Sequence, residues 1–197
     1  MKPTTRAARR GLAALALTAA AVAIPTTALA ASGSPAKPAQ AARPAAEAVP
    51  PRCGTGALTA WLGIPGDGFA GGVNYQLELS NTSRHACSLY GYPGVSALGS
   101  GGHQLGSAAG RDHAERNRLV TLSPGATAHS VVQIADVSVF TSSTCGPATA
   151  VALRVYPPGA TRSLQVPFTF RACGKKGPVY LHVRTTEGGT GIPGFSG

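Results

Sequence analysis

The stretch from Val73 to Ser80 restricts the fold of this chain more than any other feature. Its odd positions are apolar and its even positions are polar: Val73, Tyr75, Leu77 and Leu79 against Asn74, Gln76, Glu78 and Ser80. A period of two is typical of a β-strand with one buried face. Further short apolar runs follow about every ten residues between Gly and Pro turns, without a helical period. We therefore predict an all-β fold, an antiparallel immunoglobulin-like β-sandwich of about eight short strands, with a barrel as the alternative.

Only part of the 197-residue chain is expected to form this sandwich. Residues 1–30 combine a basic start, an apolar run and the small-x-small pattern Ala28-Leu29-Ala30, which predicts a secretory signal peptide cut after Ala30. Residues 31–51 are mostly Ala and Pro and predict a disordered linker. The domain is expected over residues 52–186, followed by a Gly-rich tail at 187–197.

The predicted signal peptide indicates that the chain is exported. Arg9-Arg10 leaves both the general secretory route and the twin-arginine route open. Cys53 is the first cysteine and lies far beyond the apolar run, which argues against a lipid anchor. A second long apolar segment is absent from the sequence, so we expect no membrane span in the mature chain. The expected location is extracellular, with association to the cell wall as an option.

Four cysteines follow the predicted signal peptide: Cys53, Cys87, Cys145 and Cys173. An even number in an exported chain favours disulfides. Of the three pairings we prefer Cys53–Cys87 and Cys145–Cys173, because each joins neighbours in the sequence near expected strand ends. Each bridge would contribute about 3–4 kcal/mol, mainly by restricting the unfolded chain. The spacing Cys-x-x-Cys does not occur, so a cysteine-bound metal is not expected.

Several segments predict more local features. A first strand at 57–64 is expected to end at the turn Pro65–Gly68. His129 is expected on the exposed face of a strand at 127–134. Residues 106–118 form the densest polar segment and predict a loop. The last strand should point Val179, Leu181 and Val183 inward and Tyr180, His182 and Arg184 outward.

The segment Cys87–Val95, with the sequence CSLYGYPGV, combines a cysteine, two aromatic residues and a turn. Together with Arg52-Cys53, Asn81, Leu122–Gly125, Leu153–Val155 and Ala172-Cys173, it makes residues 52–184 similar to a family of secreted actinobacterial proteins, the domain of unknown function 4232. The resemblance implies an exported β-sandwich. The family has no known activity, so the resemblance assigns no catalytic or binding residue to this chain. Many relatives look like lipoproteins with a cysteine after the signal, which this chain lacks.

The sequence contains no recognisable catalytic set. Gly-x-Ser-x-Gly, His-Glu-x-x-His and a phosphate-binding glycine loop are all absent. Asp112, His113 and Glu115 share the 106–118 loop and could form a metal or acid–base group, but a solvated loop is the favoured interpretation. We therefore expect no enzyme, no cofactor and no metal site.

A binding function remains. After the predicted signal peptide, Lys and Arg outnumber Asp and Glu by 13 to 7, which favours contact with an anionic polymer such as cell wall. The basic residues form no stripe, so nucleic acid is not expected. Trp61, Tyr90 and Tyr92 are the candidate binding surface, because aromatic rings pack against sugars. We expect a secreted, non-enzymatic module that binds a cell-envelope component or another extracellular protein. The alternative is a secreted inhibitor, or an enzyme with an unrecognised site in the 106–118 loop. The oligomeric state stays open.

Overall fold

A computed structural model describes residues 48–191 of the chain. The chain divides into two compact units, Met1–Ala45 and Ala46–Gly197, and all described residues belong to the second. The predicted signal peptide at 1–30 and most of the linker at 31–51 lie outside the described residues. So do residues 192–197 of the predicted tail.

The described residues form an all-β domain of twelve strands with three one-turn helices. The count exceeds the expected eight partly because β5, β6 and β12 are only two residues long. The strands are β1 (Leu58–Phe69), β2 (Gly72–Asn81), β3 (Cys87–Tyr90), β4 (Gly94–Leu98), β5 (Gln104–Leu105), β6 (Gly110–Arg111), β7 (Leu119–Leu122), β8 (Thr127–Ala135), β9 (Pro147–Tyr156), β10 (Leu164–Cys173), β11 (Leu181–Val183) and β12 (Glu187–Gly188). The helices are η1 (Thr55–Ala57), η2 (Val137–Val139) and α1 (Ser142–Cys145). None of the described helices is long and apolar enough to cross a membrane.

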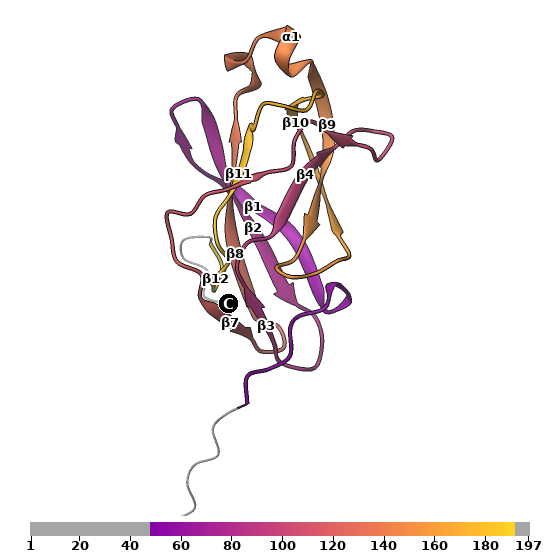
Figure 1. Cartoon of the computed structure of the whole chain (residues 1–197). Coiled ribbons are helices and arrows are strands. Elements are labelled where there is room, and N and C mark those ends of the chain that lie inside the picture. The colour runs from indigo at the N-terminus through magenta and orange to yellow at the C-terminus, as the bar shows by residue number, and fades with distance from the viewer. Residues whose placement is uncertain (1–47, 192–197) are drawn as a thin grey trace, which may run out of the picture. The chain divides into compact units, whose positions relative to one another are not determined.

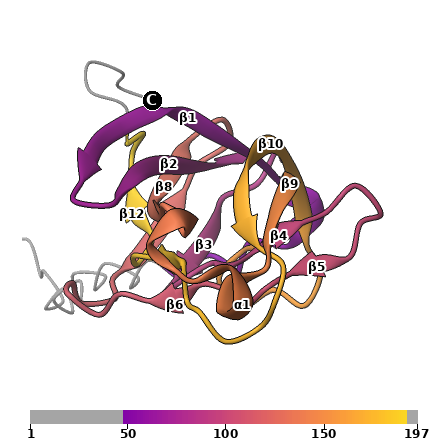
Figure 2. The same ribbon diagram turned by 90° about the horizontal axis from the view of Figure 1, so that it is seen from above.

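Three sheets organise these strands. The largest has the order β1-β2-β8-β11-β6, with β12 also paired to β8. A four-stranded sheet has the order β10-β9-β4-β5, and β3 pairs with β7. In Figure 2, β1, β2 and β8 lie on one side of the domain, and β9 and β10 lie on the other. The strand pairs of these sheets are antiparallel except for β6 with β11, which is parallel.

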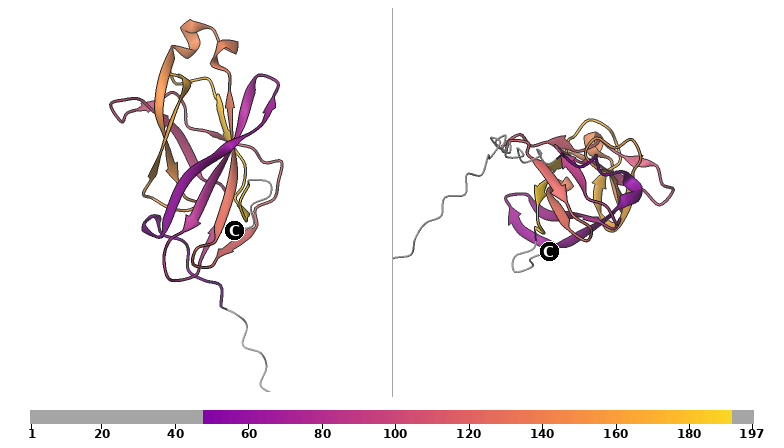
Figure 3. Two further views of the ribbon diagram at one scale, coloured as in Figure 1. Left: turned by 180° about the vertical axis from the view of Figure 1, so that it is seen from behind. Right: turned by 90° about the horizontal axis from the view of Figure 1, so that it is seen from below.

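One hydrophobic core joins the sheets. Leu77 and Leu79 of β2, Val132 of β8 and Leu153 and Val155 of β9 are all fully buried in it. The alternation from Val73 to Ser80 therefore does predict a strand whose apolar face meets the core. The view from behind the domain in Figure 3 shows β1 and β2 running together as the long outer pair of this sheet.

The prediction that the even positions of β2 face water is wrong at Glu78, which is 0% exposed. The residues after β12 cover this face: the Gly191 N–H donates to Glu78 Oε1 at 3.0 Å. His129 lies on the neighbouring strand β8, and its Nδ1 is 2.9 Å from the Gly189 carbonyl. His129 is therefore half-buried rather than exposed as predicted. The predicted tail at 187–197 thus begins within a strand that belongs to the fold.

The predicted turn at Pro65–Gly68 is also wrong, because β1 continues through it to Phe69. The register with β2 shifts on both sides of Pro65, as expected where Pro and Gly interrupt a regular ladder. β1 is the edge strand of its sheet, where the missing N–H of a proline is tolerated. The chain reverses instead between Phe69 and Gly72, where Gly71 has a φ of 87°.

The burial predicted for Val179 and Tyr180 at the start of the last strand is reversed in the structure. Tyr180 is 0% exposed, whereas Val179 is 43% exposed. The regular strand β11 starts only at Leu181, so its alternation does not extend back to these two residues. The Tyr180 hydroxyl donates to the Leu105 carbonyl at 3.4 Å, and burial of the ring raises the pKa of Tyr180 to about 12.

The structure joins Cys53 to Cys87 and Cys145 to Cys173, the pairing preferred from the sequence. The first bridge holds the start of the domain beside β3, where Arg52 makes a parallel bridge to Ser88. The segment Cys87–Val95 leaves β3, bends at Gly91 with a φ of 96° and enters β4. This bend carries the chain from the small sheet to the four-stranded sheet (Figure 1).

Candidate binding site: a cleft between β7 and β12

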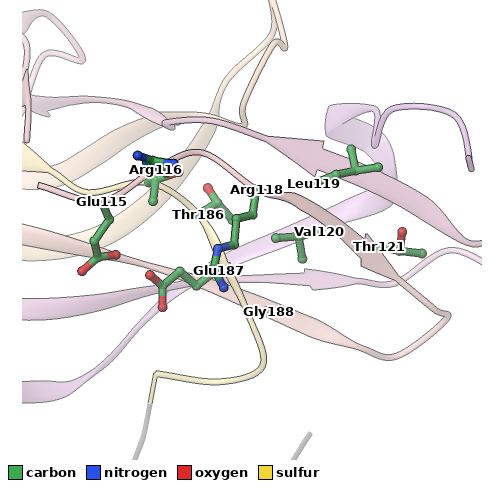
Figure 4. A pocket seen from close by; sticks show the side chains of 10 residues that line it. Glu115, Arg116, Arg118, Leu119, Val120, Thr121, Thr186, Glu187 and Gly188 are labelled. Atoms are coloured by element: carbon green, nitrogen blue, oxygen red, sulfur yellow. The ribbon is translucent and has the colours of Figure 1, made fainter. Parts of the chain in front are cut away.

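A cleft of about 700 Å³ lies between residues 115–121 and residues 185–188. Figure 4 shows Glu115 and Glu187 at one end of it and Leu119 and Thr121 at the other. The two segments are distant in sequence, but β12 lies beside β7 in the fold. We refer to this hollow as the β7–β12 cleft. Its lining residues are Glu115, Arg116, Arg118, Leu119, Val120, Thr121, Thr185, Thr186, Glu187 and Gly188.

The first wall of the β7–β12 cleft is the outer edge of β7. Ser88 of β3 donates its N–H to the Pro51 carbonyl and accepts from the Cys53 N–H, so its backbone groups point away from β7. Thr121 lies opposite Ser88 and therefore forms a non-hydrogen-bonded pair with it. The backbone groups of Thr121 and Leu119 accordingly point away from β3.

These outward backbone groups form an open strand edge. Within residues 48–191, no backbone–backbone hydrogen bond closes the edge at Leu119 or Thr121, and both residues are exposed. The cleft is lined by these two exposed residues and by Val120 from the buried face of the same strand. Because residues from both faces of β7 line the cleft, the cleft lies along the edge of this strand. We call the outward N–H and C=O groups of Leu119 and Thr121 the open edge of β7.

The second wall is held firmly by hydrogen bonds. The Thr186 N–H donates to the Gly91 carbonyl at 2.9 Å, and the Thr185 hydroxyl donates to Asn117 Oδ1 at 3.0 Å. Glu187 and Gly188 pair with β8. The hydroxyl of Thr186 is buried and has no hydrogen-bond partner among the described residues. Both walls are therefore set by backbone pairing rather than by long side chains.

The charged groups of the cleft fall into a paired set and an unpaired set. Arg184 Nε donates to Asp112 Oδ2 at 3.2 Å, and its Nη1 lies 3.8 Å from Glu115 Oε1. A hydrogen bond with the carboxyl group of Glu187 raises the pKa of Glu115. By contrast, Arg116 and Arg118 form no ion pair with any residue of the described segment.

A smaller hollow of about 150 Å³ adjoins this charged end. It shares Glu115, Thr185 and Glu187 with the larger cleft and adds His129, whose Nε2 lies 3.9 Å from Glu187 Oε2. Glu115 and Glu187 of the cleft therefore lie close to His129 on β8.

A protein-family profile described as Domain of unknown function (DUF4232) matches residues 53–187. The chain belongs to this family. The matched region starts at the first disulfide cysteine and ends in β12, so the DUF4232 region contains both disulfides and nearly all of the cleft. Searches of curated proteins and of solved structures found no match to the chain.

The DUF4232 fold does not gather the predicted aromatic surface into one platform. Trp61 lies on β1, where its Nε1 donates to Ser80 Oγ at 3.2 Å. Tyr92 contacts His113 through its hydroxyl at 3.1 Å. Tyr90 is 55% exposed and lies opposite Leu119, at the border of the cleft. Among the described residues, Trp61 has no ring contact with either tyrosine.

The polar trio of the 106–118 loop does not converge either. Asp112 and Glu115 face Arg184, whereas His113 faces Tyr92. Residues 48–191 contain no group of three His, Cys, Asp or Glu residues placed to hold a metal ion. Residues 113–118 are exposed, as expected for a solvated loop, and the start of the loop is tied to the fold where Gly110–Arg111 pair with β11.

Sequence reasoning missed the second wall and the open edge. Thr185 and Thr186 carry no motif in the sequence. The alternation of exposed and buried residues along β7 appears only in the structure, because Leu119-Val120-Thr121-Leu122 does not alternate in polarity. The position of β7 at an edge depends on pairing with β3 and could not be seen in the sequence.

Proposed function

We propose that this DUF4232 protein is an exported, non-enzymatic binding module whose β7–β12 cleft binds a cell-envelope component or another extracellular protein. The observation that carries the proposal is a cleft with firm walls, an open strand edge and two arginines without ion-pair partners among the described residues. Open backbone groups and unpaired charges are free to bind a ligand without breaking contacts of the fold.

Other observations support the proposed extracellular location and the immunoglobulin-like fold. The signal-peptide pattern of residues 1–30 and the two disulfides favour an oxidising compartment outside the cytoplasm. We propose that the two main sheets form an immunoglobulin-like sandwich, which is supported by the single core that contacts both. Of the two carboxylates that line the cleft, Glu115 lies beside Arg184 and Glu187 lies beside His129.

One observation favours the inhibitor alternative. The exposed segment between Asp112 and Asn117 is held at both ends, by Arg184 and by Thr185. A protease inhibitor presents such an exposed, rigid loop. Incubation with a panel of proteases separates the two functions: slow or absent cleavage with inhibition of the protease supports an inhibitor, and uninhibited protease excludes it.

Co-sedimentation with purified actinobacterial cell wall over a salt series tests the binding module. A double variant, Arg116→Glu with Arg118→Glu, changes the cleft. A matched control, Arg84→Glu with Lys176→Glu, makes the same charge change at exposed residues outside the cleft lining. Retention at high salt that only the cleft variant loses supports an envelope ligand at this site.

Two other results would redirect the proposal. Retention that disappears at moderate salt, and falls equally in both double variants, means that the surplus of basic residues alone attracts the wall, because exposed charges are screened beyond about 8–10 Å. Absence of retention at every salt concentration excludes the wall polymer and leaves an extracellular protein as the partner.

A further inference from the structure

We infer that the β7–β12 cleft accepts an extended peptide segment with acidic side chains, which adds as a new strand to the open edge of β7. The inference rests on the binding role proposed above and specifies its ligand. An exposed strand edge is used in this way in many peptide-binding domains, where main-chain hydrogen bonds provide affinity and side-chain pockets provide specificity.

The backbone of β7 supplies the first requirement. Leu119 and Thr121 point two N–H and two C=O groups away from β3, a pattern that a second antiparallel strand complements. Neither residue is charged or a proline, so two devices that protect an edge strand are absent from these positions, and the short length of β7 limits an added strand to a few backbone hydrogen bonds. The cleft provides the space beside this edge.

The exposed face of β7 supplies a contact for apolar side chains. Tyr90 and Leu119 lie opposite each other on β3 and β7, at 55% and 50% exposure. The side chains of a strand alternate between its two faces, so every second residue of an added strand would lie on the face that Leu119 and Tyr90 share. Such a peptide would carry apolar residues at alternate positions.

The charges of the cleft select among possible ligands. Arg116 and Arg118 line the cleft without ion pairs to described residues, so they favour acidic groups on the ligand. Glu115 and Glu187 line the same cleft near these arginines (Figure 4), which opposes a polymer that is negative along its whole length. A peptide can place its acidic residues beside the arginines and uncharged residues beside the glutamates. This mixture favours a polypeptide over a uniform polyanion.

The test uses a phage library of random peptides of roughly eight residues, a usual strand length. The wild-type chain should enrich peptides with Asp or Glu and with alternating apolar residues. The affinity of a synthetic enriched peptide is then measured for Thr121→Pro, which removes an outward N–H, and for the control Thr121→Val, which keeps it. We expect a loss of affinity of about tenfold or more with proline and a change within about threefold with valine. The Arg116→Glu, Arg118→Glu variant should also lose affinity, and the Arg84→Glu, Lys176→Glu control should retain it.

Amide hydrogen exchange of the wild-type chain gives a readout that does not depend on the folding of a variant. Addition of the selected peptide should protect the amides of Leu119 and Thr121. Unchanged exchange at both amides, or equal affinity of the proline and valine variants, would overturn strand addition.

The outcomes also separate this inference from the proposed function. If inorganic polyphosphate or cell wall binds at the cleft and no peptide is enriched, the peptide inference is wrong while the binding module stands. If peptide, polyphosphate and cell wall all fail to bind, the peptide inference and the envelope ligand are both wrong, and a folded extracellular protein is the ligand left to the proposed module.

Discussion

Replacement of Asn81 by alanine should destabilise the domain more than any other single polar substitution that we consider. Asn81 is fully buried, and its Nδ2 donates to the carbonyls of His85 at 2.9 Å and Leu122 at 3.0 Å, with Ser123 at 3.3 Å. Its Oδ1 accepts from the Ser83 N–H at 3.0 Å. One side chain therefore ties the turn after β2 to the end of β7. Asn81-Thr82-Ser83 also matches the Asn-x-Ser/Thr pattern of N-glycosylation sites. Because these bonds occupy the Asn81 side-chain amide, they argue against its glycosylation in the folded domain.

The magnitude follows from these bonds. A buried hydrogen bond contributes about 1 kcal/mol net, and a carbonyl left buried without a partner costs about 1–3 kcal/mol. Loss of two donated bonds and one accepted bond in Asn81→Ala should therefore lower the free energy of unfolding by about 3 kcal/mol. With a urea m-value of about 2 kcal/mol/M, the unfolding midpoint should fall by about 1.5 M.

Urea unfolding followed by the fluorescence of Trp61, the single tryptophan, measures this change. The matched control is Ser83→Ala, which removes the hydroxyl bonds to Asn81 Oδ1 and to the His85 carbonyl but keeps the bonds donated by Asn81 Nδ2; we expect a loss of about 1 kcal/mol or less. If Asn81→Ala unfolds within about 0.5 kcal/mol of the wild type, water replaces these bonds without loss and the reasoning fails.

Three further predictions concern stability. Cys87→Ala opens a disulfide that spans 34 residues and should cost about 3–4 kcal/mol, and an unchanged melting temperature would contradict this. Burial raises the pKa of Tyr180 to about 12, so the folded state keeps its proton at a pH where the unfolded chain loses it. Stability should then fall as pH rises from about 10 to 12, and Tyr180→Phe should flatten that slope in alkaline melts. Burial likewise raises the pKa of Glu78 above its ordinary value, so the contribution of Glu78 to stability should be greatest at low pH and be lost as pH rises through the raised value. Glu78→Gln should remove this part of the decline, and a slope equal to that of the wild type would show that other groups cause it.

Local patterns in the sequence were sufficient for the strands and the disulfides. Leu77 and Leu79 enter the core as their alternation predicts, because the side chains of a strand point to opposite faces whatever lies around them. Cys53 and Cys87 flank a single pair of long strands, β1 and β2, so their short separation in sequence becomes a short distance in space.

The candidate site could be predicted only in part. The polar segment at 106–118 was a correct pointer to one wall of the cleft, and Tyr90 lies at its border. The other wall comes from Thr185 to Gly188, a segment that crosses the predicted boundary between the domain at 52–186 and the tail at 187–197. These residues become a wall only because β12 pairs with β8, a contact between segments about sixty residues apart.

The sequence by itself determined the all-β class, the positions of the main strands and the short-range pairing of the four cysteines. These properties depend on neighbours along the chain. Only the tertiary structure decided which faces and edges stay accessible. Glu78 has the pattern of an exposed residue and is buried, whereas Thr121 belongs to a strand whose outer edge stays open. The physical reason is that alternation specifies which residues share a face, while coverage of that face and pairing of an edge depend on distant segments brought together by folding.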